Sequence, residues 1–341
     1  MPDNELKDVF KAIDKVYGKE SVSYLSGDRP VPKEVLPTGI ASLDMAVGNN
    51  GLVTGSIIEI YGPESGGKTS ISLFIIAEAQ KLGHTCAFID MEHALDTDLA
   101  NAYGVDTKKL VFDQPESGEE ALGKTEMLLE SGKVKVIVID SVDSLVPRSV
   151  LEGDFGDSNM GRQAKMMSQA MRKLSPLVEN KKALLIFINQ IRMKIGAMYG
   201  SPETTPGGNA LKFYSKYRLD VRRRESIKDK ELIIGAITKI KVKKNKKAPP
   251  FRECLFNLIY GKGIDKEVEL VAVGIALNII ERSGSWMSMC GEQIGQGSKS
   301  VIEKCKSDIS FKDKLEDLIK KHTIEPKEAV EEKDDSLTID K

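Results

Sequence analysis

The chain has 341 residues, enough for one large domain or two modest ones. Its 50 lysines and arginines nearly balance 51 aspartates and glutamates, so any nucleic-acid site must come from local basic patches. No apolar run approaches the roughly 20 residues of a membrane span, and the N-terminus lacks a signal-peptide pattern, so we expect a cytoplasmic protein with no membrane partner. The four cysteines show no CxxC spacing and the three histidines do not cluster, so we expect free thiols and no metal site built from these residues.

The first predicted element is an amphipathic helix over residues 4–17. Its apolar side chains recur at helical spacing: Leu6, Val9, Phe10, Ile13 and Val16. A helix outside a sheet must bury such a stripe, either on the core of its own chain or elsewhere. From about residue 31 to 265, strands and helices alternate, which predicts an α/β fold with a mostly parallel, doubly wound central sheet.

Residues 62–69 read GPESGGKT and lie between apolar runs at 57–61 and 71–77. Strand, glycine-rich loop and helix in this order form the context of a P-loop, whose backbone N–H groups converge on phosphate oxygens. Lys68 would reach the β- and γ-phosphates, and Thr69 would ligate Mg²⁺. The pattern therefore predicts a nucleoside triphosphate site with Mg²⁺.

Two later strands end in carboxylates. The β-branched run 136–140 ends in Asp140, which we expect at the tip of a strand neighbouring the P-loop, holding Mg²⁺. The alternative for Asp140 is a cap of the following turn. The run 85–90 leads to Glu92, our candidate to polarise the attacking water, with Asp90 as its competitor; the sequence does not rank them.

Two long irregular segments carry apolar and basic residues together: loop 1, residues 152–161, and loop 2, residues 191–209. Loops of this length inside a compact domain are typically functional or disordered. Met160, Met193 and their apolar neighbours could wedge between bases while basic residues neutralise phosphates, which would form a channel for single-stranded DNA. A pair of flexible surface loops is the alternative.

Further elements follow these loops. We expect strands at 182–190, 234–242 and 256–260, a helix at 268–280, and a small sheet or hairpin at 283–297. Gln190 ends a strand next to the P-loop and begins loop 2, so its amide could contact the γ-phosphate; satisfying loop backbone is the alternative. The run KVKKNKK at 241–247 is very basic, and such runs are commonly solvated or bind DNA nonspecifically.

The chain resembles the bacterial RecA recombinase family from about residue 18 to 300. Six motifs carry the resemblance: GPESGGKT, FIDMEHALD, VIVIDS, GDSNMGRQAKMMSQAMRKL, LLIFINQIRMKIGAMYGSPETTPGGNALKFY and IYGKGI. It implies a RecA-type P-loop ATPase core with DNA-binding loops (31–265), an N-terminal arm that packs on the neighbouring subunit of a filament (1–30), and a small α/β C-terminal domain (266–324). Residues 325–341 read as an acidic, disordered tail.

The resemblance also implies roles for individual residues. Gln190 would couple ATP to DNA, while Lys244 and Lys246 would reach the nucleotide of the adjacent subunit and act like arginine fingers. Tyr260 matches a residue that lies against that neighbour's nucleotide. The candidate nucleotide-binding residues are Gly62, Pro63, Glu64, Ser65, Gly66, Gly67, Lys68, Thr69, Ser70, Asp96, Leu99, Tyr103, Asp140 and Tyr260. The candidate DNA contacts are Met160, Gly161, Arg162, Lys165, Arg172, Arg192, Met193, Lys194, Ile195, Gly207, Gly208 and Asn209.

Three positions depart from the family. Lys165 stands where the family usually has Arg, which keeps the charge but loses bidentate phosphate geometry. Leu99 stands where the family has the Tyr that stacks on adenine, and Tyr103 stands where it has Leu. Because these two positions share one helix face, Tyr103 could lie back over Leu99 towards the base.

The resemblance implies a DNA-dependent ATPase, with ATP and Mg²⁺ as cofactors, that forms helical filaments on single-stranded DNA and exchanges it into a homologous duplex. Implied partners are single-stranded and double-stranded DNA, a LexA-type repressor whose self-cleavage it promotes in the DNA-damage response, and a single-strand-binding protein. A ring-forming helicase or clock-type ATPase would also explain the P-loop, and a non-catalytic DNA coat would explain filaments.

Overall fold

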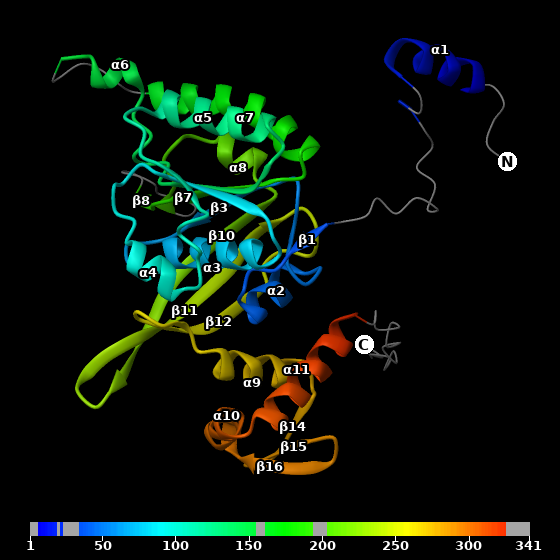
Figure 1. Ribbon diagram of the computed structural model, residues 1–341, viewed down its shortest axis with the longest axis vertical. Coiled ribbons are helices and arrows are strands. Elements are labelled where there is room, and N and C mark those ends of the chain that lie inside the picture. Colours follow the sequence, from blue (N-terminus) through cyan, green and yellow to red (C-terminus); the bar gives the residue numbers. More distant parts are fainter. Residues whose placement is uncertain (1–5, 19–20, 23–33, 155–160, 194–202, 325–341) are drawn as a thin grey trace, which may run out of the picture. The chain divides into compact units, whose positions relative to one another are not determined.

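The computed structural model describes residues 6–18, 21–22, 34–154, 161–193 and 203–324 (Figure 1). The chain divides into two compact units, Met1–Glu34 and Val35–Lys341. The first unit contains the predicted amphipathic helix, α1 (Lys7–Tyr17), which buries none of its residues. Within its apolar stripe, Val9 is 49% and Val16 is 72% exposed, whereas Phe10 and Ile13 are half-buried.

The second unit is built on a central sheet that has nine strands among the described residues. In spatial order these are β13 (Gly263–Ile264), β12 (Glu253–Ile259), β11 (Leu232–Asn245), β10 (Tyr217–Asp229), β3 (Ser56–Tyr61), β7 (Leu184–Asn189), β6 (Val134–Asp140), β4 (Thr85–Asp90) and β5 (Val111–Asp113). From β10 to β5 all neighbours pair in parallel, whereas β10 to β13 form antiparallel pairs. This confirms the predicted α/β class with a mostly parallel sheet.

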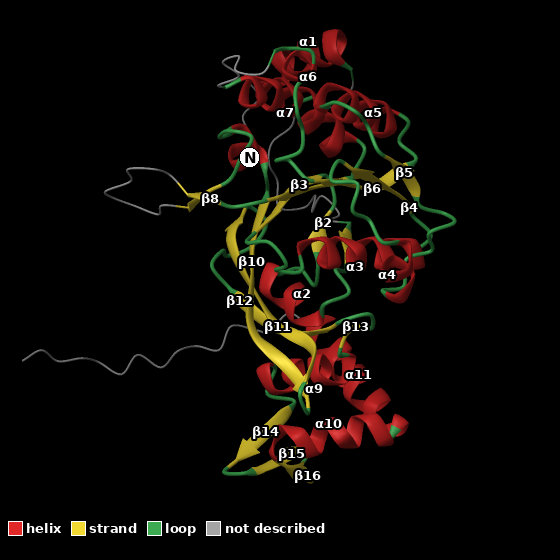
Figure 2. Cartoon of the chain, turned by 90° about the vertical axis from the view of Figure 1, so that its left-hand side faces the viewer, coloured by secondary structure: helices red, strands yellow, loops and turns green. Residues whose placement is uncertain are grey.

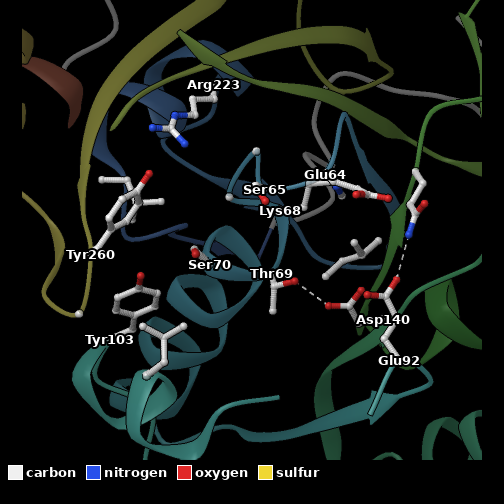
Figure 3. A pocket seen from close by; sticks show the side chains of 17 residues that line it. Glu64, Ser65, Lys68, Thr69, Ser70, Glu92, Tyr103, Asp140, Arg223 and Tyr260 are labelled. Carbon is white, nitrogen blue, oxygen red and sulfur yellow. Dashed lines mark hydrogen bonds between the residues drawn. The ribbon is translucent and has the colours of Figure 1, made fainter. Parts of the chain in front are cut away.

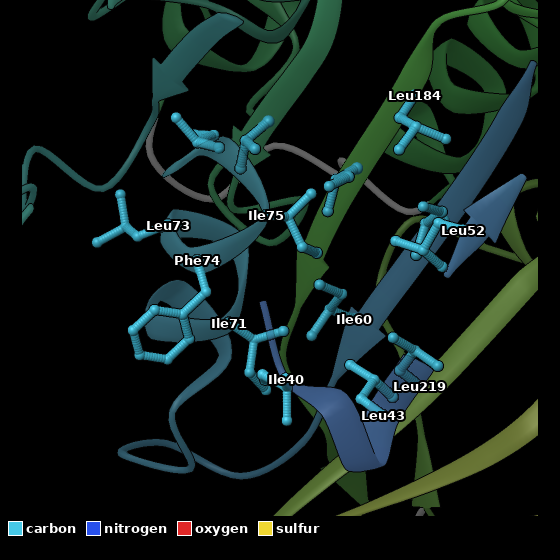
Figure 4. Close-up of a cluster of buried hydrophobic side chains, with 14 of the residues drawn as sticks. Ile40, Leu43, Leu52, Ile60, Ile71, Leu73, Phe74, Ile75, Leu184 and Leu219 are labelled. Atoms are coloured by element: carbon cyan, nitrogen blue, oxygen red, sulfur yellow. The ribbon is translucent and has the colours of Figure 1, made fainter. Parts of the chain in front are cut away.

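Helices cover both faces of this sheet, as the continuous apolar strands require. Figure 1 shows α5, α7 and α8 over one face and α2, α3 and α4 over the other. The helices on these two faces are α2 (Ala41–Val47), α3 (Lys68–Lys81), α4 (Thr97–Ala102), α5 (Gly118–Glu130), α7 (Arg162–Asn180) and α8 (Ala210–Tyr214). Alternate residues of a strand enter opposite cores: Ile58 belongs to the cluster that includes α3, as does Ile60 (Figure 4), whereas Ile57 belongs to the cluster that includes α7.

Short strands and helices complete the described chain. They are β1 (Val35–Leu36), β2 (Leu52–Val53), β8 (Arg192–Met193), β9 (Glu203–Thr204), β14 (Ile280–Ser283), β15 (Trp286–Met289), β16 (Glu292–Gln296), α6 (Arg148–Leu151), α9 (Lys266–Ala276), α10 (Gly297–Ser307) and α11 (Ile309–Ile324). The antiparallel pair β8–β9 forms the stem of loop 2. Strands β14 to β16 form a three-stranded sheet that packs with α9 and α10 around its own apolar core (Figure 2).

Two elements differ from expectation. The helix predicted to reach residue 280 ends at Ala276, because Asn278 adopts a left-handed backbone (φ 56°) and Ile280 begins β14. The strand predicted at 234–242 is longer, since β11 pairs with β10 in a long hairpin. Apolar side chains at the far end of this hairpin, such as Leu232 (73% exposed), are not covered by the rest of the unit.

Candidate functional site

The phosphate loop joins the buried strand β3 to the buried helix α3. Its last residue, Gly67, has φ 91°, a backbone conformation that glycine adopts without strain, and it directly precedes the first turn of α3. A pocket of about 690 Å³ opens over this loop. The residues that line it are Glu64, Ser65, Gly66, Gly67, Lys68, Thr69, Ser70, Glu92, Leu99, Tyr103, Asp140, Ile188, Gln190, Arg223, Leu258, Tyr260 and Gly261.

Lys68 is only 8% exposed at the base of this pocket. Its Nζ donates hydrogen bonds to the carbonyl oxygens of Pro63 (2.7 Å) and Gly62 (3.2 Å), so the loop itself holds the ammonium group in place. Burial lowers the pKa of Lys68, and the carboxylate of Asp140 opposes this shift. A buried ammonium beside a helix N-terminus is suited to an anionic ligand such as a phosphate.

Thr69 and Asp140 meet above α3. Oγ1 of Thr69 donates a 2.7 Å hydrogen bond to Oδ2 of Asp140 (Figure 3). Burial, helped by the nearby carboxylates of Glu92 and Asp90, raises the pKa of Asp140 to about 7 against the lowering effect of the hydrogen bond from Thr69. The hydroxyl of Thr69 and the carboxylate of Asp140 are oxygen groups of the kind that Mg²⁺ prefers, and the surrounding carboxylates would favour a cation.

Strand β6, which carries Asp140, is separated from β3 by β7, so the expectation of a strand neighbouring the P-loop strand was wrong.

The two competing carboxylates have different surroundings. Asp90 is 1% exposed, does not line the pocket, and accepts hydrogen bonds from the backbone N–H groups of Glu92 and Leu95 and from Nε2 of Gln114. Glu92 lines the pocket, and its Oε1 accepts a 3.3 Å hydrogen bond from Nε2 of Gln190. The geometry therefore favours Glu92 for contact with a bound nucleotide or its water.

The end of the pocket beyond Ser70 carries two tyrosines. Tyr103 is 9% exposed, and its ring packs on Phe74 with a centroid distance of 4.8 Å. Burial raises the pKa of Tyr103, opposed by a hydrogen bond with the Ser70 side chain. Tyr260 lies close to it and is 46% exposed (Figure 3). Tyr260 lines the pocket of its own chain, whereas the resemblance implies a place against the nucleotide of a neighbouring subunit. Leu99 also lines this pocket.

One nucleotide candidate has a structural task instead. Asp96 is the N-cap of α4, where its Oδ1 accepts hydrogen bonds from the N–H groups of Asp98 (2.8 Å) and Leu99 (3.1 Å), and it does not line the pocket. Four lining residues escaped sequence reasoning: Ile188, Arg223, Leu258 and Gly261. Gly261 adjoins Tyr260 in sequence, but Arg223 belongs to a strand whose register only the folded hairpin reveals.

The candidate DNA contacts lie on loop stems and on α7. Gly161 is the N-cap of α7 with φ 80°, and Arg162, Lys165 and Arg172 project from that helix.

In loop 2, Arg192 forms an ion pair with Asp143. Met193 is 65% exposed, Gly207 and Gly208 have φ 81° and 75°, and Asn209 is the N-cap residue of α8. Met160, Lys194 and Ile195 lie outside the described residues.

Neither Lys244 nor Lys246 lines the pocket of its own chain. Nζ of Lys244 donates to the carbonyl oxygens of Lys212 (2.6 Å) and Phe213 (2.9 Å) near the C-terminal end of α8. Burial lowers the pKa of Lys244 to about 8, with added repulsion from Lys246 and Arg218. The two lysines are therefore placed away from the phosphate loop that the same chain supplies.

The buried strand, phosphate loop and helix, with Thr69 joined to a strand-end Asp140, define a P-loop nucleoside triphosphatase. The RecA N-terminal domain family matches residues 4–265, and the RecA C-terminal domain family matches residues 268–324. Protein RecA of Saccharopolyspora erythraea is 52% identical over 308 residues, which cover 90% of this chain and 89% of that protein. Protein RecA of Rickettsia canadensis is 52% identical over 309 residues, which cover 90% of each chain.

The chain therefore belongs to the RecA family, as its motifs indicated. It is a DNA-dependent ATPase of DNA recombination and repair. Among the described residues, no helix combines the length and apolar character needed to cross a membrane.

Proposed function

We propose that this chain polymerises on single-stranded DNA as a helical filament, binds ATP with Mg²⁺ at the pocket over residues 62–70, and exchanges the bound strand into a homologous duplex. Lys68 would hold the β- and γ-phosphates, Thr69 and Asp140 would hold Mg²⁺, and Glu92 would polarise the attacking water. ATP supplies the phosphoryl group when bound. The protein's own contribution is to position the phosphates and to orient the attacking water.

The observation that carries the proposal is the 3.3 Å hydrogen bond from Nε2 of Gln190 to Oε1 of Glu92. It joins the proposed hydrolytic carboxylate directly to the residue that immediately precedes loop 2. A P-loop ATPase that does not depend on DNA has no need for this connection. In a DNA-dependent ATPase, the nucleotide pocket and the DNA-binding loop must be coupled.

The filament part of the proposal is supported by residues that lie outside the core and outside the nucleotide pocket of their own chain. Helix α1 buries none of its residues, which fits docking of its apolar stripe on a second copy of the chain. Lys244 and Lys246 lie away from their own pocket, which fits a role at the nucleotide of an adjacent subunit. We propose an arm at 1–30, an ATPase core at 31–265, a C-terminal domain at 266–324 and an acidic tail at 325–341, which lies outside the described residues.

The deciding experiment measures phosphate release with and without single-stranded DNA, using Lys68→Ala as the inactive control. Electron microscopy with DNA and a slowly hydrolysed ATP analogue then separates the architectures. Helical filaments support the proposal, whereas closed rings would indicate a helicase-like assembly. Filaments without phosphate release would indicate a non-catalytic DNA coat.

The finer partners also belong to this proposal. A DNA-bound filament of this family would promote self-cleavage of a LexA-type repressor, and a single-strand-binding protein would compete for the same DNA. Incubating the filament with such a repressor and following the cleaved fragments tests the first point. Intact repressor in the presence of active filaments would remove this part of the proposal and leave strand exchange untouched.

A further inference from the structure

We propose that the turn Ser141–Leu145, here called the coupling turn, links loop 2 to the hydrolytic carboxylate, and that the ion pair between Arg192 and Asp143 is a latch that single-stranded DNA opens. This inference rests on the proposed function, because it takes Glu92 as the water-polarising group and Arg192 as a DNA contact.

The coupling turn follows β6 and is held as one tight unit. The backbone N–H of Ser144 donates to the carbonyl oxygen of Ser141, and that of Leu145 donates to the carbonyl oxygen of Val142, each at 3.2 Å. The side chains of Val142 and Leu145 are both fully buried. Since interiors are close-packed, a displacement at one end of such a unit is passed to its other end.

A side chain next to loop 1 braces this turn. Nε2 of Gln163 lies within hydrogen-bond distance of the carbonyl oxygens of Val142 (2.8 Å), Leu145 (3.2 Å) and Asp143 (3.3 Å). Gln163 stands in the first turn of α7, two residues after Gly161, which ends loop 1. The coupling turn is therefore hydrogen-bonded to the helix that follows loop 1, in addition to its ion pair with loop 2.

At its start, the coupling turn holds the hydrolytic carboxylate. Oγ of Ser141, which is fully buried, donates a 2.5 Å hydrogen bond to Oε1 of Glu92. The same oxygen accepts the 3.3 Å hydrogen bond from Gln190. An oxygen that already accepts two hydrogen bonds is less available to take a proton from water, so this arrangement describes a resting state.

In its middle, the coupling turn holds loop 2. The carboxylate of Asp143 is paired with the guanidinium of Arg192, and the two side chains are 25% and 58% exposed. A DNA phosphate that engages Arg192 must compete with this carboxylate, because both are anions that a guanidinium binds. When the phosphate takes Arg192, the turn loses its tie to loop 2, and Ser141 is free to release Glu92.

The test begins with Asp143→Asn, which keeps the side-chain shape and removes the charge. We expect about two- to fivefold tighter binding of a fluorescent oligothymidylate, measured by anisotropy with a slowly hydrolysed ATP analogue, because an exposed ion pair no longer competes. We also expect DNA-free phosphate release to rise about twofold or more while the DNA-saturated kcat stays unchanged. Glu126→Gln, which removes the carboxylate from an ion pair of similar exposure with Lys173 on α7, is the matched control and should change neither quantity.

Two double variants separate the steps. In the Arg192→Ala background, Asp143→Asn should no longer tighten DNA binding, because there is no guanidinium to release. In the Ser141→Ala background, Asp143→Asn should still tighten DNA binding but should no longer raise DNA-free turnover, since the link to Glu92 is missing.

Each failure has its own meaning. Equal DNA-free turnover in Asp143→Asn and the wild-type chain would overturn the coupling. A gain in DNA affinity that survives without Arg192, or that Glu126→Gln reproduces, would overturn the latch in favour of general charge repulsion. A wild-type chain whose phosphate release is not stimulated by single-stranded DNA would instead overturn the proposed function, and the latch with it.

Discussion

Oγ1 of Thr69 and Oδ2 of Asp140 lie 2.7 Å apart, although 71 positions separate the two residues in the chain and β7 lies between β3, which leads into the phosphate loop, and β6, which ends in Asp140. The contact is possible because α3, which carries Thr69 in its first turn, packs against both β7 and β6. Two hard oxygen atoms that could ligate Mg²⁺ are thus joined by a hydrogen bond. Burial, which raises the pKa of Asp140 to about 7, makes a cation at this point favourable.

The first prediction concerns this pair. Thr69→Ala should raise the Mg²⁺ concentration for half-maximal ATP hydrolysis about tenfold or more, because one hard ligand and the orienting hydrogen bond are both lost. Thr69→Ser, which keeps the hydroxyl, should stay close to the wild-type chain. Titration of phosphate release against Mg²⁺ measures the effect, and an unchanged Mg²⁺ requirement in Thr69→Ala would remove the hydroxyl from the metal site.

The second prediction separates the two carboxylates that the sequence left unranked. Glu92→Gln should retain ATP binding and lower kcat by about 10²- to 10⁴-fold, the usual contribution of a general base. Asp90→Asn should chiefly lower the thermal midpoint, because Asp90 is buried and accepts hydrogen bonds from Glu92, Leu95 and Gln114. Single-turnover hydrolysis with bound ATP distinguishes the two, and normal turnover by Glu92→Gln would transfer the role elsewhere.

Local patterns in the sequence were sufficient to predict the phosphate loop, the α/β class and the strand that ends in Asp140. Each of these depends on residues close together in the chain, such as glycines at fixed spacing or a β-branched run. The order of the strands was not predicted from the sequence. Strand β7 lies between β3 and β6, and this order depends on packing across the whole sheet.

Contacts between side chains from distant segments could not be predicted from the sequence, for the same reason. Nothing near Arg223 signals that its strand borders the nucleotide pocket, and nothing near Asp143 signals a partner 49 residues away. The N-cap role of Asp96 competes with its predicted nucleotide contact, and spacing alone does not separate the two roles, because both use the same carboxylate at the start of a helix.

The third prediction tests the proposed role of Lys244 across the subunit interface. If its ammonium group stabilises charge on a neighbour's nucleotide, DNA-dependent turnover should fall as the pH rises above about 8, the pKa to which burial lowers this lysine. Lys244→Arg should flatten that decline, because a guanidinium stays charged. A pH profile from 7 to 9.5 records both, and a Lys244→Arg profile identical to that of the wild-type chain would contradict the assignment.

Mixing subunits provides the control for that role. Lys244→Ala and Lys68→Ala should each be inactive alone. Mixed together they should recover part of the DNA-dependent turnover, because some interfaces then combine an intact Lys68 with an intact Lys244. Full activity of Lys244→Ala by itself would reduce the run at 241–247 to a basic surface.

The fourth prediction concerns stability at the joint between α2 and α9. Oε1 and Oε2 of Glu269 accept hydrogen bonds from Oγ (2.7 Å) and the N–H of Ser42, and burial raises the pKa of nearby Asp44 from 3.8 to about 7. A carboxyl that holds its proton more tightly when folded stabilises the fold at low pH. That stability is lost as the pH rises from about 4 to 7.

Asp44→Asn should therefore flatten the pH dependence of unfolding. Relative to the wild-type chain, the variant should gain about 1–3 kcal/mol in the free energy of unfolding between pH 4 and pH 8. Its amide oxygen can still accept the 2.9 Å hydrogen bond from the N–H of Thr38. Thermal melts of both proteins across this range test the sign, and parallel curves would show that Asp44 does not titrate between these pH values.

The fifth prediction comes from the exchange of residues at positions 99 and 103. Tyr103 lines the pocket but packs one side of its ring on Phe74, so Tyr103→Ala would both remove a base contact and open a cavity. Tyr103→Leu is the cleaner change, since leucine refills most of that space. We expect it to raise the KM for ATP about tenfold, because aromatic stacking on a base contributes about 1–3 kcal/mol.

The reciprocal change supplies the decisive comparison. The double variant Leu99→Tyr/Tyr103→Leu has the family's usual arrangement and should bring the KM back to the wild-type value or below, while Leu99→Ala alone should have a milder effect than Tyr103→Leu. Thermal midpoints show whether each variant keeps its packing against Phe74. If Tyr103→Leu leaves the KM unchanged and Leu99→Tyr alone tightens ATP binding, then Tyr103 serves only to pack on α3, and this chain holds adenine through Leu99 and Tyr260.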